Sequence, residues 1–147
     1  EHVEKVIKPA LQNNMIVISD RYIDSSIAYQ GYGLGQDFNR IMQINEAATG
    51  GLWPDLTLLL QVDAGCGLQR HCRSNKNREA GSLDRIEQRE LGFHERVGAG
   101  YGQLAAMFPQ RVVSLDTTAL PIEKVHGEIW QALTNRLDIP LPNKNCT

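Results

Sequence analysis

The spacing of apolar residues changes along the chain between a helical and an extended period. Helical spacing predicts a first helix over residues 2–13, in which Pro9 kinks the helix or lies near its first turns. The short apolar run Met15–Ser19 then predicts a buried strand. A second helix begins at Ser25–Tyr29, and three glycines after it indicate a flexible loop. These glycines are Gly31, Gly33 and Gly35.

The second half of the chain continues the alternation. Asp37 is an expected helix N-cap, and Gly50-Gly51 ends that helix. Leu56–Asp63 is almost continuously apolar, which favours a strand that is buried on both faces and therefore parallel to its neighbours. Further helices are expected over 64–73, over 85–107 and from Pro121, with a third strand at Arg111–Leu115. The apolar stripe of the last helix is Ile122, Val125, Ile129 and Leu133.

Strands that alternate with helices favour an α/β fold with a parallel sheet and right-handed crossovers. The chain has 147 residues, of which 41% are hydrophobic, and this size suits one domain with one core. We place this domain at residues 1–137. Residues 138–147 contain two prolines and are expected to form an irregular tail.

Charge and cysteine content narrow the possible functions. Lys and Arg number 15 against 17 for Asp and Glu, so the net charge of −2 predicts no bulk affinity for nucleic acid or an anionic membrane. No apolar run reaches membrane-spanning length, and the first residues do not resemble a signal peptide. Cys66, Cys72 and Cys146 are odd in number and lack C-x-x-C spacing, which favours a reducing cytoplasm. His71 beside Cys72 lacks further ligands at zinc spacing, so an ordinary surface pair is the better interpretation.

The predicted strand Met15–Ser19 ends in Asp20 and Arg21. Ligands of open parallel sheets bind beyond the carboxyl ends of the strands, so this pair is expected to face a site. The Arg21 guanidinium matches the geometry of a phosphate, and the Asp20 carboxylate can hold a metal ion or its waters. The pair therefore indicates phosphate chemistry.

Another candidate for phosphate binding is the cationic segment of residues 70–78, which holds four basic residues and no acidic residue. Such a segment is often a solvated helix end, where cations compensate the helix dipole. It also suits a lid that closes over phosphates, because cations supply much of the catalysis in phosphoryl transfer. The sequence contains no G-x-x-x-x-G-K-[ST] loop and begins at Glu1 without a methionine, so we expect a phosphotransferase fragment that lacks its phosphate loop.

Two further features leave their alternatives open. Tyr29 and Gln30 offer an aromatic edge and an amide that can contact a base or sugar, although such residues are commonly core or surface residues. Gly98, Gly100 and Gly102 lie inside a predicted helix, where each costs about 1 kcal/mol relative to Ala. Either a packing need explains them or the helix is weak there.

The order of motifs resembles the thymidylate kinase family, most closely its bacterial type with arginines in the lid. The resemblance covers the chain up to about residue 135 and rests on a series of short motifs. These are Val3–Leu11, Asp20-Arg21-Tyr22, Ser26 with Ala28-Tyr29-Gln30-Gly31, Pro54-Asp55-Leu56-Thr57, Leu83-Asp84-Arg85-Ile86-Glu87 and Phe93-His94-Glu95-Arg96-Val97. The family transfers the γ-phosphoryl group of MgATP to dTMP.

The resemblance implies a binding site for dTMP. Arg21 would hold the dTMP phosphate, and Tyr101 would lie near it. Ser26 would reach the edge of the thymine base with Gln30 close by. Tyr29 would pack near the deoxyribose and disfavour a 2′-hydroxyl group.

The resemblance also implies the positions of ATP and Mg²⁺. Asp20 would sit by the metal, with water between them where needed, and by the phosphates. The lid would span about residues 73–85 and contact the ATP phosphates through Arg78 and Arg85, with Arg73 behind them.

The implied fold is the three-layer parallel sheet of the nucleoside monophosphate kinases with a phosphate loop, without its first strands. The missing strand would lie between Met15–Ser19 and Leu56–Val62, so we expect this chain alone to be marginally folded and inactive. The resemblance further implies a cytoplasmic homodimer. The alternatives are a deoxynucleoside or other nucleoside monophosphate kinase and a truncated, non-catalytic product.

Overall fold

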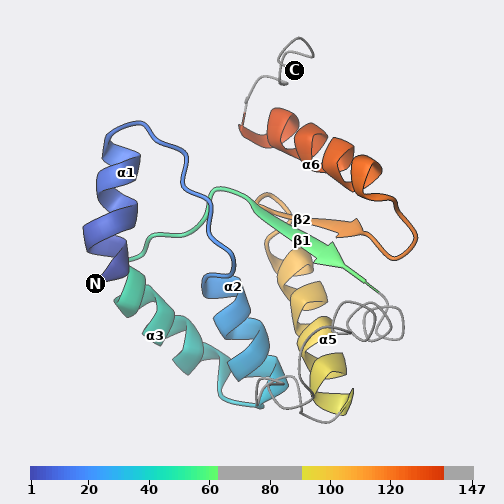
Figure 1. The fold of residues 1–147 in the computed structure, drawn as a ribbon. Coiled ribbons are helices and arrows are strands. Elements are labelled where there is room, and N and C mark those ends of the chain that lie inside the picture. Colours follow the sequence, from blue (N-terminus) through green and yellow to red (C-terminus); the bar gives the residue numbers. More distant parts are fainter. Residues whose placement is uncertain (63–90, 138–147) are drawn as a thin grey trace, which may run out of the picture.

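The computed structural model describes residues 1–62 and 91–137. The expected helix over 64–73, the cationic segment, the lid over 73–85 and the tail over 138–147 lie outside the described residues. Within them, residues 1–49 contain helical segments only, strands alternate with helices from residue 57 onward, and the two strands pair in parallel (Figure 1). The predicted α/β class with a parallel sheet is therefore confirmed.

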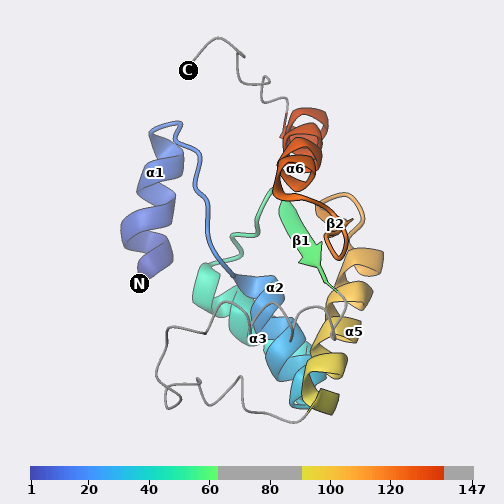
Figure 2. The same cartoon turned by 45° about the vertical axis from the view of Figure 1, so that its right-hand side comes forward.

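Strands β1 (Thr57–Gln61) and β2 (Val112–Asp116) form the sheet, with Thr57 opposite Val112 and Gln61 opposite Asp116. Two parallel strands require a crossover between them, and helix α5 (Leu91–Met107) lies in that part of the chain. Helix α6 (Ile122–Leu137) lies on the opposite side of the strands from α5 in both views (Figures 1 and 2). The described strands thus have helices on both sides, as a parallel sheet needs.

The predicted first helix is confirmed. It consists of a π-helical segment η1 (Val3–Ile7) that continues directly into α1 (Lys8–Gln12). Pro9 is the second residue of α1 and lies inside this continuous helix, next to the junction with the π-helical segment. Of its apolar residues Val3, Val6, Ile7 and Leu11, only Val3 and Ile7 are buried.

The prediction of a buried strand at Met15–Ser19 is wrong. The segment is irregular, and the side chains of Met15, Ile16 and Ile18 are 59%, 69% and 93% exposed. A strand is stabilised by the ladder that it forms with a neighbour. Within the described part of the chain the sheet has two strands, and neither pairs with this segment.

The prediction of a flexible glycine loop is also wrong for Gly31 and Gly33. Helix α2 (Ile23–Ser26) continues into a second π-helical segment, η2 (Ile27–Gly33), in which both glycines are buried. A Cβ atom on Gly33 would lie 2.7 Å from Cε2 of Phe93 and from Cγ2 of Val97. Gly33 therefore permits the close approach of η2 to α5, and only Gly35 follows the helix, with φ +69°.

Helix α3 (Phe38–Thr49) begins and ends where the sequence predicts. The Asp37 side chain accepts a hydrogen bond from the backbone N–H of Arg40 at 2.7 Å, which is the geometry of an N-cap. Gly50 has φ +63°, the left-handed conformation that ends many helices.

The remaining elements match their predictions closely, with one correction to burial. Strand β2 is displaced by one residue from the predicted range, α5 ends at Met107, and α6 begins directly after Pro121. Strand β1 is not buried on both faces, because Leu60 is 50% exposed and Val62, just beyond the strand, is 41% exposed. Residues 85–90 of the expected long helix lie outside the described residues.

The core lies where α2 and η2 pack against α3 and α5. Its buried members are Ile23, Ile27, Ala28, Ile41, Phe93, Val97 and Leu104.

The glycines inside α5 were expected to reflect either a packing need or a weak helix. At Gly100 the reason is packing, because a Cβ there would lie 2.7 Å from three side-chain atoms of Tyr32. Gly98 and Gly102 have open space at that position, so packing explains Gly100 alone.

Candidate functional site

The segment between the irregular run and helix α2 holds the Asp-Arg pair. Arg21 adopts a left-handed backbone with φ +67°, an uncommon conformation for a residue with a side chain. The Ser19 hydroxyl donates a hydrogen bond of 2.9 Å to the carbonyl oxygen of Arg21 and so supports this turn. The exposed Arg21 guanidinium lies over the ring of Tyr29, 5.2 Å from its centroid.

Tyr29 is the centre of an aromatic group that joins η2 to α5. Its ring meets Phe93 edge-on at a centroid distance of 6.0 Å and Tyr101 at 6.5 Å. Such edge-to-face pairs are favourable beyond the area that they bury. The hydroxyl groups of Tyr101 and Ser25 form a hydrogen bond of 2.8 Å between α5 and α2.

The predicted base-reading pair is also in contact. The Ser26 hydroxyl donates to Oε1 of Gln30 at 3.0 Å, one helical turn further along. The Gln30 side chain is exposed, and this bond leaves its NH₂ group directed away from Ser26. The Gln30 amide donors therefore take no part in the bond to Ser26.

An ion pair anchors this helix to the start of both strands. Asp24 is buried and receives two hydrogen bonds from the Arg111 guanidinium, at 2.6 and 2.7 Å, and one from the Thr57 hydroxyl at 2.7 Å. The Arg111 guanidinium also lies over the rings of Trp53 and Phe108. Asp24 directly precedes Ser25 in the chain, so the ion pair fixes the helix that carries the candidate site.

Burial changes the titration of one hydroxyl in the site. Removal from water raises the pKa of Tyr101 above its ordinary value, while the hydrogen bond to Ser25 acts in the opposite direction. Weaker effects come from Tyr29 and Asp24, which raise this pKa, and from Arg21, which lowers it. Tyr101 is therefore a neutral hydrogen-bonding group at physiological pH.

Sequence reasoning missed Asp24 and Ser25. Asp24 lies at a buried position between Ile23 and Ile27, and a buried carboxylate requires a cationic or hydrogen-bonding partner, which was the available signal. No signal pointed to Ser25, because its role depends on the position of Tyr101, 76 residues away.

Other candidate groups fall outside this cluster. Asp20 is exposed next to Arg21, and Arg73, Arg78 and Arg85 lie outside the described residues. Among residues 1–62 and 91–137, no three His, Cys, Asp or Glu side chains gather as a metal-binding group. The same ranges contain no helix long and apolar enough to cross a membrane.

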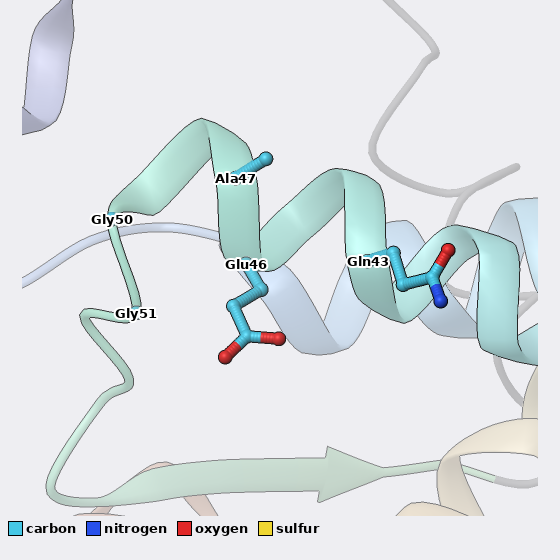
Figure 3. Close-up of a pocket in the computed structure, with 5 residues that line it drawn as sticks. All are labelled: Gln43, Glu46, Ala47, Gly50 and Gly51. Carbon is cyan, nitrogen blue, oxygen red and sulfur yellow. The ribbon is translucent and has the colours of Figure 1, made fainter.

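A separate open hollow lies at the C-terminal end of α3 (Figure 3). Glu46 projects from the helix beside the turn formed by Gly50 and Gly51, and Gln43 and Ala47 complete the lining. None of the residues that meet around Tyr29 lines this hollow.

The fold and the cluster define a class of protein. A parallel α/β arrangement carries an exposed arginine at a sharp turn, with its guanidinium over a tyrosine ring, and the helical segments that follow this turn carry hydrogen-bonded serine and glutamine side chains. These are the groups with which α/β proteins bind phosphorylated small molecules.

Comparison with known proteins gives the family. The sequence model of thymidylate kinase matches residues 1–129. The chain is 45% identical to the thymidylate kinase of Synechococcus sp. (strain JA-2-3B'a(2-13)), over 95% of this chain and 63% of that protein. It is also 45% identical to the thymidylate kinase of Trichormus variabilis, over 93% of this chain and 62% of that protein. The chain therefore belongs to the thymidylate kinase family.

A solved structure agrees with this assignment. The crystal structure of thymidylate kinase from Ehrlichia chaffeensis superposes with a TM-score of 0.63 at 32% sequence identity, over 90% of this chain and 58% of that one. The chain spans less than two thirds of the length of these relatives.

Proposed function

We propose that the protein containing this chain transfers the γ-phosphoryl group of MgATP to dTMP, in the supply of dTTP. The observation that carries the proposal is the cluster around Tyr29. Arg21 and Tyr101, both expected at a dTMP site, each contact the Tyr29 ring, and the expected base-binding residues Ser26 and Gln30 are hydrogen-bonded to each other; these contacts support the proposal. Family membership supports the same activity.

Arg21 binds the dTMP phosphate in this proposal. Its guanidinium is exposed, carries no salt bridge among the described residues, and rests on the face of Tyr29. A guanidinium binds phosphate oxygens in a bidentate manner, whereas its contact with a ring is weaker and yields to an anion. Tyr101 meets the Tyr29 ring edge-on at a centroid distance of 6.5 Å and supplies a neutral hydroxyl to the same anion.

Ser26 and Gln30 recognise the thymine base. Because the Gln30 carbonyl oxygen accepts from Ser26, its NH₂ group is left to donate to a base carbonyl. Cytosine carries an amino donor where thymine carries a carbonyl oxygen, so this arrangement favours thymine. Tyr29 packs beside the deoxyribose, where its ring leaves little space for a 2′-hydroxyl group.

In this proposal, ATP and Mg²⁺ are bound by Asp20 and by the arginines of the lid, which lie outside the described residues. Asp20 suits Mg²⁺ chemically, since this ion is commonly held by one or two carboxylates together with waters and phosphate oxygens. When bound, Mg²⁺ neutralises charge on the phosphates. Arg78 and Arg85, with Arg73 behind them, contact the ATP phosphates from the lid over residues 73–85.

The proposal includes the assembly and the compartment. A homodimer forms through the helices that flank the sheet, and the exposed Val6 and Leu11 on η1 and α1 are available for such an interface. The protein acts in the cytoplasm. The 147-residue chain by itself is inactive, because its sequence contains no G-x-x-x-x-G-K-[ST] loop to hold ATP.

Replacement of Arg21 tests the proposal in the native protein that contains this chain. We expect Arg21→Ala to lower kcat/KM for dTMP by about 10²-fold or more, because it removes a phosphate-binding cation. Arg21→Lys should recover only part of the loss, since Lys cannot bind in a bidentate manner. Arg40→Ala, an exposed arginine on α3, is the matched control and should retain activity.

ADP release with a panel of nucleoside monophosphates completes the test. Phosphorylation of dTMP in clear preference to dCMP, dGMP and UMP is the expected result. A native protein that does not phosphorylate dTMP refutes the proposal. A preference for another acceptor would instead identify a kinase for a different nucleoside monophosphate.

A further inference from the structure

We infer that Ser25 is a positioning residue that orients the Tyr101 hydroxyl so that the Tyr101 proton is directed to the phosphate group of the acceptor. The inference rests on the proposed function and assigns a role to a residue that no sequence motif indicated. Ser25 acts through Tyr101 and need not touch the substrate.

The geometry supports this role. Ser25 belongs to α2 and Tyr101 to α5, and their hydroxyl oxygens lie 2.8 Å apart in a partly buried position. Tyr101 packs edge-on against Tyr29 at 6.5 Å, and Tyr29 carries the Arg21 guanidinium on its face. Tyr29 therefore contacts both the Tyr101 ring and the cation expected to hold the phosphate, and the charge of that cation acts on the Tyr101 hydroxyl.

The number of protons on the two hydroxyls decides what the pair can do. Each hydroxyl donates one hydrogen bond and accepts two. When Ser25 donates to the Tyr101 oxygen, the proton of Tyr101 remains available for an anion. When Tyr101 donates to Ser25, that proton is consumed inside the protein. A phosphate beside Arg21 favours the first arrangement, because it offers Tyr101 a charged acceptor.

The surroundings keep Tyr101 in the protonated form that this role needs. Burial is the main effect and raises its pKa, while Arg21 and the Ser25 hydrogen bond lower it. Asp24 and Tyr29 are the other titratable groups that act on it, and both raise its pKa. A phenolate would repel the phosphate, whereas the neutral phenol donates to it.

A double-mutant cycle in the native protein tests whether Ser25 acts through Tyr101. The variants are Ser25→Ala, Ser25→Thr, Tyr101→Phe and the Ser25→Ala/Tyr101→Phe double variant. We expect Ser25→Ala to raise the KM for dTMP about fivefold to tenfold, the effect of one hydrogen bond, with a smaller change in kcat. Ser25→Thr restores the hydroxyl and should restore KM. Ser114→Ala, an exposed serine on β2, is the matched control.

The cycle distinguishes positioning from an independent effect. If Ser25 acts through Tyr101, Ser25→Ala adds nothing to the KM of Tyr101→Phe, and the two substitutions are strongly non-additive. If the KM change is the same in both backgrounds, or if Ser25→Ala leaves KM unchanged, the inference is overturned.

A second measurement does not depend on activity. The pKa of Tyr101, followed by NMR of ¹³C-labelled tyrosine, should rise in Ser25→Ala, because the bond that lowers it is lost. An unchanged pKa overturns the inference even where KM changes. A native protein that neither binds nor phosphorylates dTMP refutes the proposed function and this inference together. A native protein that does both, with Ser25→Ala indistinguishable from it, refutes the inference alone.

Discussion

Because Gly100 packs closely against Tyr32, we predict that replacement by alanine is less favourable at Gly100 than at Gly98 of the same helix. A Cβ at Gly100 would lie 2.7 Å from Cβ, Cγ and Cδ2 of Tyr32, far inside the separation of about 3.5 Å at which two carbon atoms rest. Two of these atoms are the root of the side chain, so Tyr32 cannot yield without moving η2. Overpacking of this kind costs about 1–3 kcal/mol.

Alanine also favours the helix by about 1 kcal/mol relative to glycine. Comparison with the same substitution at Gly98 separates this contribution from the packing effect. Gly98 lies on the same helix and has nothing within 4 Å of the corresponding Cβ position. Gly98→Ala should therefore raise the free energy of unfolding by about 1 kcal/mol. Gly100→Ala should fall below Gly98→Ala by the overpacking cost alone, about 1–3 kcal/mol.

Urea unfolding of the native protein, followed by circular dichroism, measures both variants. The midpoint concentration should be higher than wild type for Gly98→Ala and clearly lower for Gly100→Ala than for Gly98→Ala, with unchanged m-values. Equal midpoints for the two variants would show that η2 and α5 do not approach closely at Tyr32. An equal rise of both midpoints above wild type would show that helix propensity alone determines the effect of alanine in α5.

Two further predictions concern charged and titratable groups. Arg111→Met leaves the buried Asp24 carboxylate without its guanidinium and should lower the free energy of unfolding in urea by about 3–5 kcal/mol. An Asp24→Leu/Arg111→Met double variant removes both charges and should lower it clearly less. Equal losses in the two variants would argue against an ion pair. Burial raises the pKa of Tyr101, so above about pH 10 the unfolded state loses this proton before the folded state does, and stability should fall as pH rises through the folded pKa. Tyr101→Phe should reduce that fall; Tyr22, whose pKa is also raised by burial, retains part of it, and an unchanged slope would contradict the assignment.

Elements with local signals could be predicted from the sequence. Helix α3 combines a helical period with an Asp37 cap and a left-handed Gly50, and all three signals lie within or next to the helix. The same holds for α6, which begins directly after Pro121. Caps and periodicity act over one or two turns, so they need no knowledge of the rest of the fold.

Contacts between distant segments could not be predicted in this way. Gly33 resembled a loop residue because glycine is rare inside helices, and only the position of Phe93, 60 residues later, explains why a side chain is excluded there. The pairing of Ser25 with Tyr101 and of Asp24 with Arg111 likewise depends on how α2, α5 and β2 meet. The residue types of the cluster around Tyr29 were predictable from family motifs, but the hydrogen bonds that orient them were not.

The run Met15–Ser19 shows that an apolar pattern indicates which side chains favour burial, but not whether the rest of the chain buries them. Full burial of one large aliphatic side chain contributes about 1.5–3 kcal/mol, and here Ile16 and Ile18 remain 69% and 93% exposed. That unrealised burial is substantial beside a typical net stability of about 5–15 kcal/mol. β-Branched residues favour an extended backbone, but only a neighbouring strand converts that preference into a hydrogen-bonded ladder. Such a neighbour is absent among residues 1–62 and 91–137, so the segment keeps the composition of a central strand without the structure of one.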